Sequence, residues 1–363
     1  MKKSLVAFAV LSAFAGAASA QSSVTVFGVV DLSANSWKNG SNEQKRLDSN
    51  QMNSNRLGFR GTEDLGGGMS ASFWLEGGMD NSAGLGGNAN GGFDFQRRST
   101  VSLSGAFGEV RLGRDYTSPF ILDATFDVYG ANGMGNSLNL YASAAATMGS
   151  GAGTVVRANN MAAYFLPANL GGVYDSVQFA AAEVGAVDGG TVKAAGNGMT
   201  AGVIGYAQGP INVAIGLAQT KTATVNDFKV MNIGGSYNFG VVKVLGLWDQ
   251  HKYGALKYTT TQLSVSVPVG AGEIKASYVR GDASGSVATQ NKDSTLVAAE
   301  YIHNLSKRTA LYAQVGQVDN KSGTAASPGG AATVGGGLAA TAAELAVGGF
   351  KSTGYGVGVR HSF

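Results

Sequence analysis

The dominant pattern along the chain is an alternation of apolar and polar positions. Near the C-terminus Tyr355, Val357 and Val359 share one parity, while glycines and an arginine occupy the other. Leu57 and Phe59 alternate in the same way with arginines and a glycine. A period of two is typical of β-strands, because successive side chains point to opposite faces of a sheet. One face of the predicted sheet is therefore apolar, and the other carries small polar groups and arginines.

This alternation predicts sixteen strands, each about ten residues long. They cover residues 24–37, 52–64, 69–80, 93–104, 109–117, 155–166, 172–184, 199–208, 211–221, 229–239, 241–251, 258–268, 273–281, 294–304, 309–319 and 352–363. Many segments of this length, separated by turn residues, are the spacing expected of a transmembrane β-barrel. We therefore predict an all-β protein with one antiparallel transmembrane barrel.

The predicted connections fall into a short class and a long class. Short turns occur at 65–68, 105–108, 167–171, 209–210 and 305–308, and long connections follow Trp37, Asp80, Thr117, Val184, Gly281 and Asp319. Short turns at one rim and long loops at the other are typical of outer-membrane barrels, with the short rim periplasmic. The alternative is a soluble β-sandwich, which would have to protect its sheet edges. A closed barrel instead satisfies every backbone polar group in lipid.

The first twenty residues have the pattern of a secretory signal. Lys2 and Lys3 precede an apolar stretch, and Ala18-Ser19-Ala20 forms a cleavage site of small residues. The apolar stretch is shorter than the roughly 20 residues that a membrane-spanning helix needs. We predict that residues 1–20 are removed and that residues 21–363 form a single barrel domain.

Composition narrows the function further. The 56 glycines disfavour a mainly helical protein, and the absence of cysteine excludes a disulfide-stapled domain. The formal net charge is only +3, and two of the cations belong to the predicted leader. Such a nearly neutral chain offers no electrostatic basis for binding nucleic acid.

Several segments resemble the trimeric general-diffusion porins of Gram-negative bacteria, especially the β-proteobacterial branch. They are spread from end to end of the predicted mature chain, at residues 23–28, 55–66, 73–77, 107–115, 304–312 and 358–363. The resemblance implies a sixteen-stranded barrel, a homotrimer, and a third extracellular loop folded into the lumen. It also implies that Phe363 is the assembly signal read by the barrel-insertion machinery. Further expected partners are outer-membrane lipid and lipopolysaccharide, and small hydrophilic solutes and anions.

The stretch from Ser118 to Thr154 is the candidate for the inward loop. It is far longer than the usual connection, which is about 4–6 residues, and loops of such length are normally functional or disordered. Asp123 and Asp127 lie in it among aromatic residues. Folded into the lumen, the loop would place these carboxylates opposite the barrel wall. The alternative is a surface loop with solvated aspartates.

Arg56 and Glu76 are the first pair expected on that wall. Arg56 has the parity opposite to Leu57, so its side chain is predicted to point into the lumen. A turn centred between Gly66 and Gly67 brings Glu76 close to Arg56 in height. An arginine and a carboxylate on one lumen face can hold each other extended.

Further arginines belong to the same predicted constriction. Arg157 has the parity opposite to Tyr164 and is expected to point inward. Alternation with Val101 favours Arg98 as the inward residue of the fourth strand, whereas the resemblance favours Arg97; a bulge would reconcile the two, and both are kept. Each arginine could instead make an interfacial or loop contact, because arginine side chains snorkel readily.

Catalytic chemistry is not supported by the residue pattern. His251, His303 and His361 lie on separate predicted strands, so neither a metal site nor a general base is indicated. We expect no enzyme activity, no metal and no cofactor. The predicted function is a water-filled channel in the outer membrane, weakly anion-selective because guanidinium groups do not lose their charge. The alternatives are a substrate-specific channel of the same fold and, less favoured, a soluble secreted β-rich adhesin.

Overall fold

The computed structural model describes most of the chain beyond the predicted leader. The described residues are 23–87, 91–140, 148, 150, 152–181, 184–187, 190–193, 198–222, 225–285, 293–321, 326–328 and 349–363. The predicted signal at residues 1–20 lies outside these ranges, and so does most of the last long connection.

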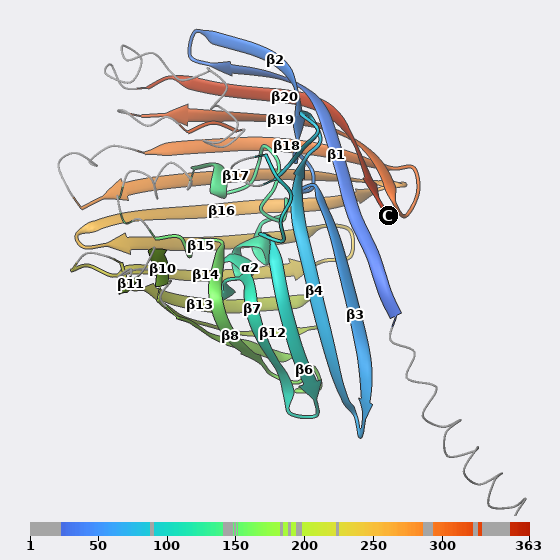
Figure 1. The fold of residues 1–363 in the computed structure, drawn as a ribbon. Helices are drawn as coiled ribbons and strands as arrows, with labels where there is room; N and C mark the ends of the chain where they lie inside the picture. The colour runs from blue at the N-terminus through green and yellow to red at the C-terminus, as the bar shows by residue number, and fades with distance from the viewer. Residues whose placement is uncertain are drawn as a thin grey trace, which may run out of the picture.

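Within the described residues, sixteen antiparallel strands close into a barrel (Figure 1). In wall order they are β1 (Ser23–Asn39), β3 (Arg56–Gly66), β4 (Met69–Asp80), β6 (Arg98–Gly105), β7 (Gly108–Tyr116), β8 (Arg157–Phe165), β9 (Val173–Ala180), β12 (Met199–Gln208), β13 (Ile211–Thr220), β14 (Phe228–Asn238), β15 (Lys243–Tyr253), β16 (Leu256–Val269), β17 (Gly272–Ser284), β18 (Ser294–Asn304), β19 (Thr309–Asn320) and β20 (Lys351–Ser362). Each predicted strand corresponds to one of them, so the predicted fold is confirmed.

The barrel is closed by pairing of the last strand with the first. β20 runs antiparallel to β1 from the pair Val29 and Ser362 to the pair Asn39 and Ser352. Phe363, just beyond β20, exchanges two backbone hydrogen bonds of 3.1 Å with Gly28. The ring of Phe363 occupies the space that a Cβ at position 28 would need, so a glycine is required there.

In the described part of the chain, four further strands lie outside this set of sixteen. They are β2 (Asn42–Ser49), β5 (Leu85–Gly86) and the pair β10 (Val184–Val187) and β11 (Gly190–Lys193). The long connection predicted after Trp37 is present between β1 and β3, but it contains an unpredicted strand, because β1 turns tightly at Gly40 and pairs with β2. Asn39-Gly40 is a strong hairpin signal, but polar residues on both faces of β2 hid its strand periodicity.

The two faces of the wall have opposite polarity. Val357 and Leu263 point outward and are 61% and 60% exposed, whereas Gln178 and Asn232 point inward and are fully buried. An apolar exterior around a polar interior is the arrangement of a barrel that faces lipid. Among the described residues, no helix has the length and apolar character needed to cross a bilayer.

The third long connection, between β7 and β8, folds into the barrel. Its helix α2 (Ser118–Phe126) has a proline in its first turn, where the fixed φ of proline suits a helix. α2 packs against the inner side of β9 and β12–β15 (Figure 1). Leu122 and Phe126 are buried there with Ala214 and Leu247 from the wall. The predicted inward loop is therefore confirmed.

Candidate functional site

Arg56 and Glu76 form the first ion pair of the interior. Arg56 begins β3 and is the cross-strand partner of Gly78 in β4. Glu76 lies two residues before Gly78, at the adjacent inward position of β4. Arg56 Nη1 lies 3.5 Å from Glu76 Oε1. The register is shifted by one residue from the predicted one because the chain bulges between Asp64 and Gly66. The predicted proximity of the two side chains survives that shift.

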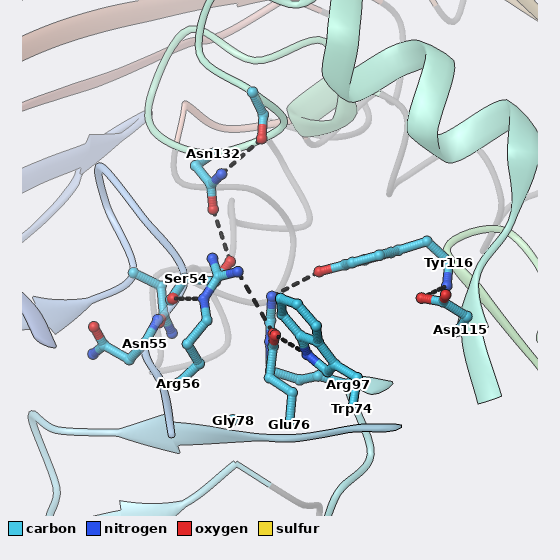
Figure 2. A network of polar contacts seen from close by, with 12 residues as sticks. Ser54, Asn55, Arg56, Trp74, Glu76, Gly78, Arg97, Asp115, Tyr116 and Asn132 are labelled. Carbon is cyan, nitrogen blue, oxygen red and sulfur yellow. Dashed lines mark hydrogen bonds and ion pairs between the residues drawn. The ribbon is translucent and has the colours of Figure 1, made fainter. Parts of the chain in front are cut away.

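Glu76 is held by two more neighbours (Figure 2). Arg97 Nε donates to Glu76 Oε1 at 2.6 Å, and Trp74 Nε1 donates to Glu76 Oε2 at 3.0 Å. Both carboxylate oxygens are therefore engaged, and the side chain is only 5% exposed. The negative charge of Glu76 is turned toward the wall and its arginines.

Arg97 and Arg157 share the phenol of Tyr116, the last residue of β7. Arg97 Nη2 donates to the Tyr116 hydroxyl at 2.7 Å, and Arg157 Nη2 donates to the same oxygen at 2.8 Å. The Arg157 guanidinium also lies 4.3 Å from the Tyr116 ring centroid, and its Nε donates to the Arg97 carbonyl at 2.8 Å. Stacking and hydrogen bonds thus hold two cations side by side, which would otherwise repel.

Arg98 forms a second layer of the interior charge. As the first residue of β6 it has the inward parity. Its guanidinium carbon lies 4.7 Å from the centroid of the Trp74 ring, and its Nε lies 3.3 Å from Asp115 Oδ2. Arg97 precedes the strand, so the alternation does not govern its direction. Both arginines thus contact residues of the inward parity, Arg97 at Glu76 and Arg98 at Trp74, and the pairing of β4 with β6 has no bulge.

The loop approaches this arginine wall at Asn132. Ser54 Oγ donates to Asn132 Oδ1 at 2.8 Å, and Arg56 Nε donates to the Ser54 carbonyl at 2.9 Å (Figure 2). Further along, Gln314 of β19 accepts a hydrogen bond from the Met134 backbone at 3.2 Å. The third connection thus extends across the interior toward the strands that carry Arg56.

The loop aspartates do not face the arginines, contrary to our expectation. Asp123 accepts a 2.8 Å hydrogen bond from Asn232 of β14, and Asp127 accepts one of 2.9 Å from Gln262 of β16. Their exposed fractions are only 6% and 3%. The physical reason is that α2 packs directly on β14 and its neighbours, and Asp127, at the end of α2, reaches β16. This side of α2 is its contact with the barrel, away from the lumen.

Burial also changes the ionisation of these two loop carboxyls. It raises the pKa of Asp123 to about 7, against a hydrogen bond from Asn232 that lowers it. It raises the pKa of Asp127 to about 6, against hydrogen bonds from the Tyr129 backbone and Gln262. Near neutral pH the loop therefore contributes less negative charge than two solvated aspartates would.

Three contributors to this site were not identified from the sequence. Tyr116 joins two arginines, Trp74 lies between Glu76 and Arg98, and Asp115 pairs with Arg98. Trp74 has the same parity as Glu76, which would have placed it inward. Over the described residues, no group of three or more histidine, cysteine or acidic residues is placed to hold a metal ion.

A closed barrel with an apolar exterior, a charged interior and an inward third loop defines a membrane channel. The model of the Gram-negative porin family matches residues 7–324. The chain therefore belongs to the Gram-negative porin family, and it is an outer-membrane protein.

Individual relatives agree with that assignment. The chain is 40% identical to outer membrane porin protein 32 of Delftia acidovorans, over the full length of both chains. A solved anion-selective porin from Comamonas acidovorans matches with a TM-score of 0.78 and 35% identity, over 94% of this chain and all of that one. The trimer form of OmpT from Vibrio cholerae matches over 94% and 99% with a TM-score of 0.61, but at 14% identity it shows the fold alone. These findings do not support the adhesin alternative.

Proposed function

We propose that this porin is a passive diffusion channel for small hydrophilic solutes and ions, with a preference for anions. The observation that carries the proposal is the unequal exposure of charge. Arg56 is 24% exposed, whereas Glu76, its partner, is 5% exposed. The guanidiniums of Arg56 and Arg97 contact this carboxylate, and Arg157 shares the Tyr116 hydroxyl with Arg97. The excess charge on this wall is positive and is available to passing ions.

Simple electrostatics indicates that this excess is large enough to matter. A unit charge about 6 Å from an ion gives roughly 3 kcal/mol at an effective dielectric near 20. Salt screens within about 8 Å at physiological strength, so about 1 kcal/mol is a reasonable remainder inside a narrow passage. Since guanidinium groups remain charged at all physiological pH values, the preference should persist. The anion selectivity named for the Comamonas acidovorans porin supports the same direction.

The assignment of the constriction differs from the sequence-based one. We assign Arg56, Arg97 and Arg157 to the narrow passage, with Arg98 behind them and Glu76 as the residue that positions them. We assign to Asp123 and Asp127 the role of holding the third loop against the barrel wall. The electric field across the passage is therefore weaker than it would be if the carboxylates of Asp123 and Asp127 faced the arginines.

Assembly and processing form a separate part of the proposal. We infer a homotrimer in the outer membrane, a leader removed after residue 20, and recognition of Phe363 by the barrel-insertion machinery. The exposed ring of Phe363 beside Gly28 is compatible with such recognition before the barrel closes. We expect passive diffusion without catalytic turnover, because the family consists of channels.

Recording from the purified protein in a planar bilayer under a potassium chloride gradient tests the proposal. We expect stepwise conductance, and a zero-current potential whose sign indicates chloride preference. A potential of the opposite sign would contradict the anion preference, and the absence of conductance would contradict the channel. Saturable block by one solute at micromolar concentration would instead indicate the substrate-specific alternative.

A further inference from the structure

The side of α2 that faces the lumen is apolar. Leu122, Asp123 and Phe126 are buried against the wall, so the opposite side of the helix is turned toward the passage. Ile121 is 39% exposed on that side although it lies inside the barrel, and Thr125, one turn later, is exposed as well. Asp123 is the only charged residue of α2. The lumen side of the helix therefore carries no charge.

The hydroxyl of Thr125 is turned back to the helix. Its Oγ1 donates to the carbonyl of Ile121 at 2.7 Å, and a hydroxyl has only one hydrogen to donate. Phe120 and Ala124 precede these two residues and are half-buried. We call Phe120, Ile121, Ala124 and Thr125 the apolar strip. The strip offers a passing solute apolar surface and no side-chain hydrogen-bond donor.

The apolar strip begins at the arginine wall. The ring of Phe120 stacks on the ring of Tyr116, with centroids 4.9 Å apart and planes inclined by 15°. The Tyr116 hydroxyl accepts hydrogen bonds from Arg97 and Arg157, and Figure 2 shows it reaching toward Arg97. The Arg157 guanidinium carbon lies 4.3 Å from the centroid of the same ring. A cationic surface and an apolar surface thus meet at Tyr116.

These two surfaces favour different parts of a solute. A guanidinium group binds a carboxylate well because its planar donors match the two carboxylate oxygens. Aromatic rings pack favourably against other rings, and apolar contact displaces water from both partners. Chloride and acetate can use the cationic surface, but they have little or no apolar area for the strip. A carboxylate attached to an aromatic ring uses both surfaces at once.

We propose that the passage contains a subsite for small aromatic carboxylates, of which benzoate is the simplest. The carboxylate lies against the guanidinium of Arg157, and the ring lies on Phe120 and Ile121. The arginines admit anions in general, and the apolar strip selects among them. This inference rests on the proposed anion channel, because a passage closed to anions would not admit benzoate.

Block of the chloride current by added solutes tests the subsite. The purified protein is recorded in a planar bilayer in potassium chloride at neutral pH, while potassium benzoate, potassium acetate or benzamide is titrated on one side. Benzamide has nearly the size of benzoate but no charge, so it controls for steric block. We expect benzoate to half-block the current in the millimolar range. Acetate should need at least about fivefold more because it lacks the ring, and benzamide at least about fivefold more because it lacks the charge.

Two variants test the apolar strip itself. Ile121→Gln places an amide in the strip and should raise the half-blocking concentration of benzoate about threefold, and that of acetate much less. Thr125→Val keeps the shape of the side chain and should not weaken the block by benzoate, because the hydroxyl already donates to the helix. Val225→Gln is the matched control, since Val225 is 99% exposed in the connection between β13 and β14. It should leave the ratio of benzoate to acetate block unchanged.

Three results would contradict the subsite. The first is equal block by benzoate and acetate, and the second is equal block by benzoate and benzamide. The third is an equal change for benzoate and acetate in Ile121→Gln, which would indicate an altered width of the passage instead of a lost apolar contact. The zero-current potential in potassium chloride alone reports the anion preference separately. A chloride preference combined with any of these three results removes only the subsite, whereas a potassium preference contradicts the proposed function.

Folding of each variant is checked by the heat-dependent mobility of the barrel on gels.

Discussion

Two sides of the same barrel interior treat charged residues in opposite ways. On the open side, formed by β3, β4 and β8, Arg56 and Arg97 contact one carboxylate and Arg157 lies beside Arg97 at Tyr116. These three arginines are partly exposed. On the fastened side, formed by β14 and β16, Asp123 and Asp127 are buried between the third loop and the wall. Only the first side presents charge to solutes.

This difference shows that the number of charged residues does not determine the field in the passage. A count of arginines against Glu76, Asp123 and Asp127 comes out nearly balanced. Burial, however, raises the pKa of both aspartates and removes them from the lumen surface. The arginines keep their charge because a guanidinium group is not deprotonated at physiological pH. Although the positive and negative residues are nearly equal in number, the charge exposed in the passage is therefore mainly positive.

The largest effect is expected from breaking the fastened side. Asp127 accepts hydrogen bonds from the backbone of Tyr129 and Ala131 and from Gln262. Asp127→Ala leaves these donors without their acceptor, at about 1–3 kcal/mol for each one that stays buried. We expect the loop to detach, with larger and noisier single-channel conductance. Asp227→Ala in an exposed connection is the control, and wild-type conductance in Asp127→Ala would show that the loop is held by other contacts.

The fastened side should also respond to pH. The raised pKa values mean that the docked loop binds protons more tightly than free aspartates, whose pKa is about 3.9. The stabilisation from the neutral carboxyls is complete below that value and is lost as the pH rises through about 6 to 7. For Asp127 the loss amounts to about 3 kcal/mol.

Hydrogen exchange of α2 and the following turn measures this dependence. After correction for the intrinsic rate, protection at pH 5 should exceed protection at pH 8. Asp123→Asn keeps an acceptor for Asn232 and should reduce the difference, because one titrating group is gone. Protection that increases with pH would contradict the assigned role of these carboxyls.

A smaller effect is expected from removing the carboxylate of the open side. Glu76→Gln deletes the negative charge beside Arg56 and Arg97 while keeping the approximate shape. The ratio of chloride to potassium permeability should rise about two- to threefold, for a screened contribution of under about 1 kcal/mol. Glu43→Gln on the exposed hairpin is the matched control. A fall in the ratio would mean that Glu76 chiefly orders the arginines.

The smallest effect is expected from removing the hydroxyl of Tyr116, which Arg97 and Arg157 share. Tyr116→Phe keeps the ring under Arg157 but removes the oxygen that Arg97 and Arg157 both contact. We expect a change of less than about twofold in permeability ratio, with increased current noise from freer guanidiniums, because both charges remain and each of the two lost hydrogen bonds contributes only about 1 kcal/mol. Tyr237→Phe on the outer face should have no effect. A complete loss of selectivity would make Tyr116 more central than we propose.

The wall of the barrel could be predicted from the sequence because its periodicity is local. Alternation alone assigns Tyr355 and Val357 to lipid and Arg56 to the lumen, and each assignment agrees with the structure. Alternation fails where the chain leaves the strand. Arg97 lies one residue before β6, and its direction depends on Glu76 and Tyr116 instead.

The fastened side could not be predicted because its partners are distant in sequence. Asp123 meets Asn232 and Asp127 meets Gln262, and each pair is separated by more than a hundred residues. The direction of an aspartate within a loop carries no periodic signal. The resemblance to porins implied that the loop folds inward, but it did not show which side of the loop would face the wall.

The zero-current potential of the double variant Arg56→Ser, Arg157→Ser tests the central claim most directly. Removing two of the three partly exposed guanidiniums should lower the ratio of chloride to potassium permeability at least about fivefold, for about 1 kcal/mol of screened interaction. The potential in a potassium chloride gradient should therefore shift toward that of a cation-preferring channel. Arg280→Ser with Arg308→Ser, both exposed outside the passage, is the control. An unchanged potential in Arg56→Ser, Arg157→Ser would show that the arginine wall does not set the ion preference.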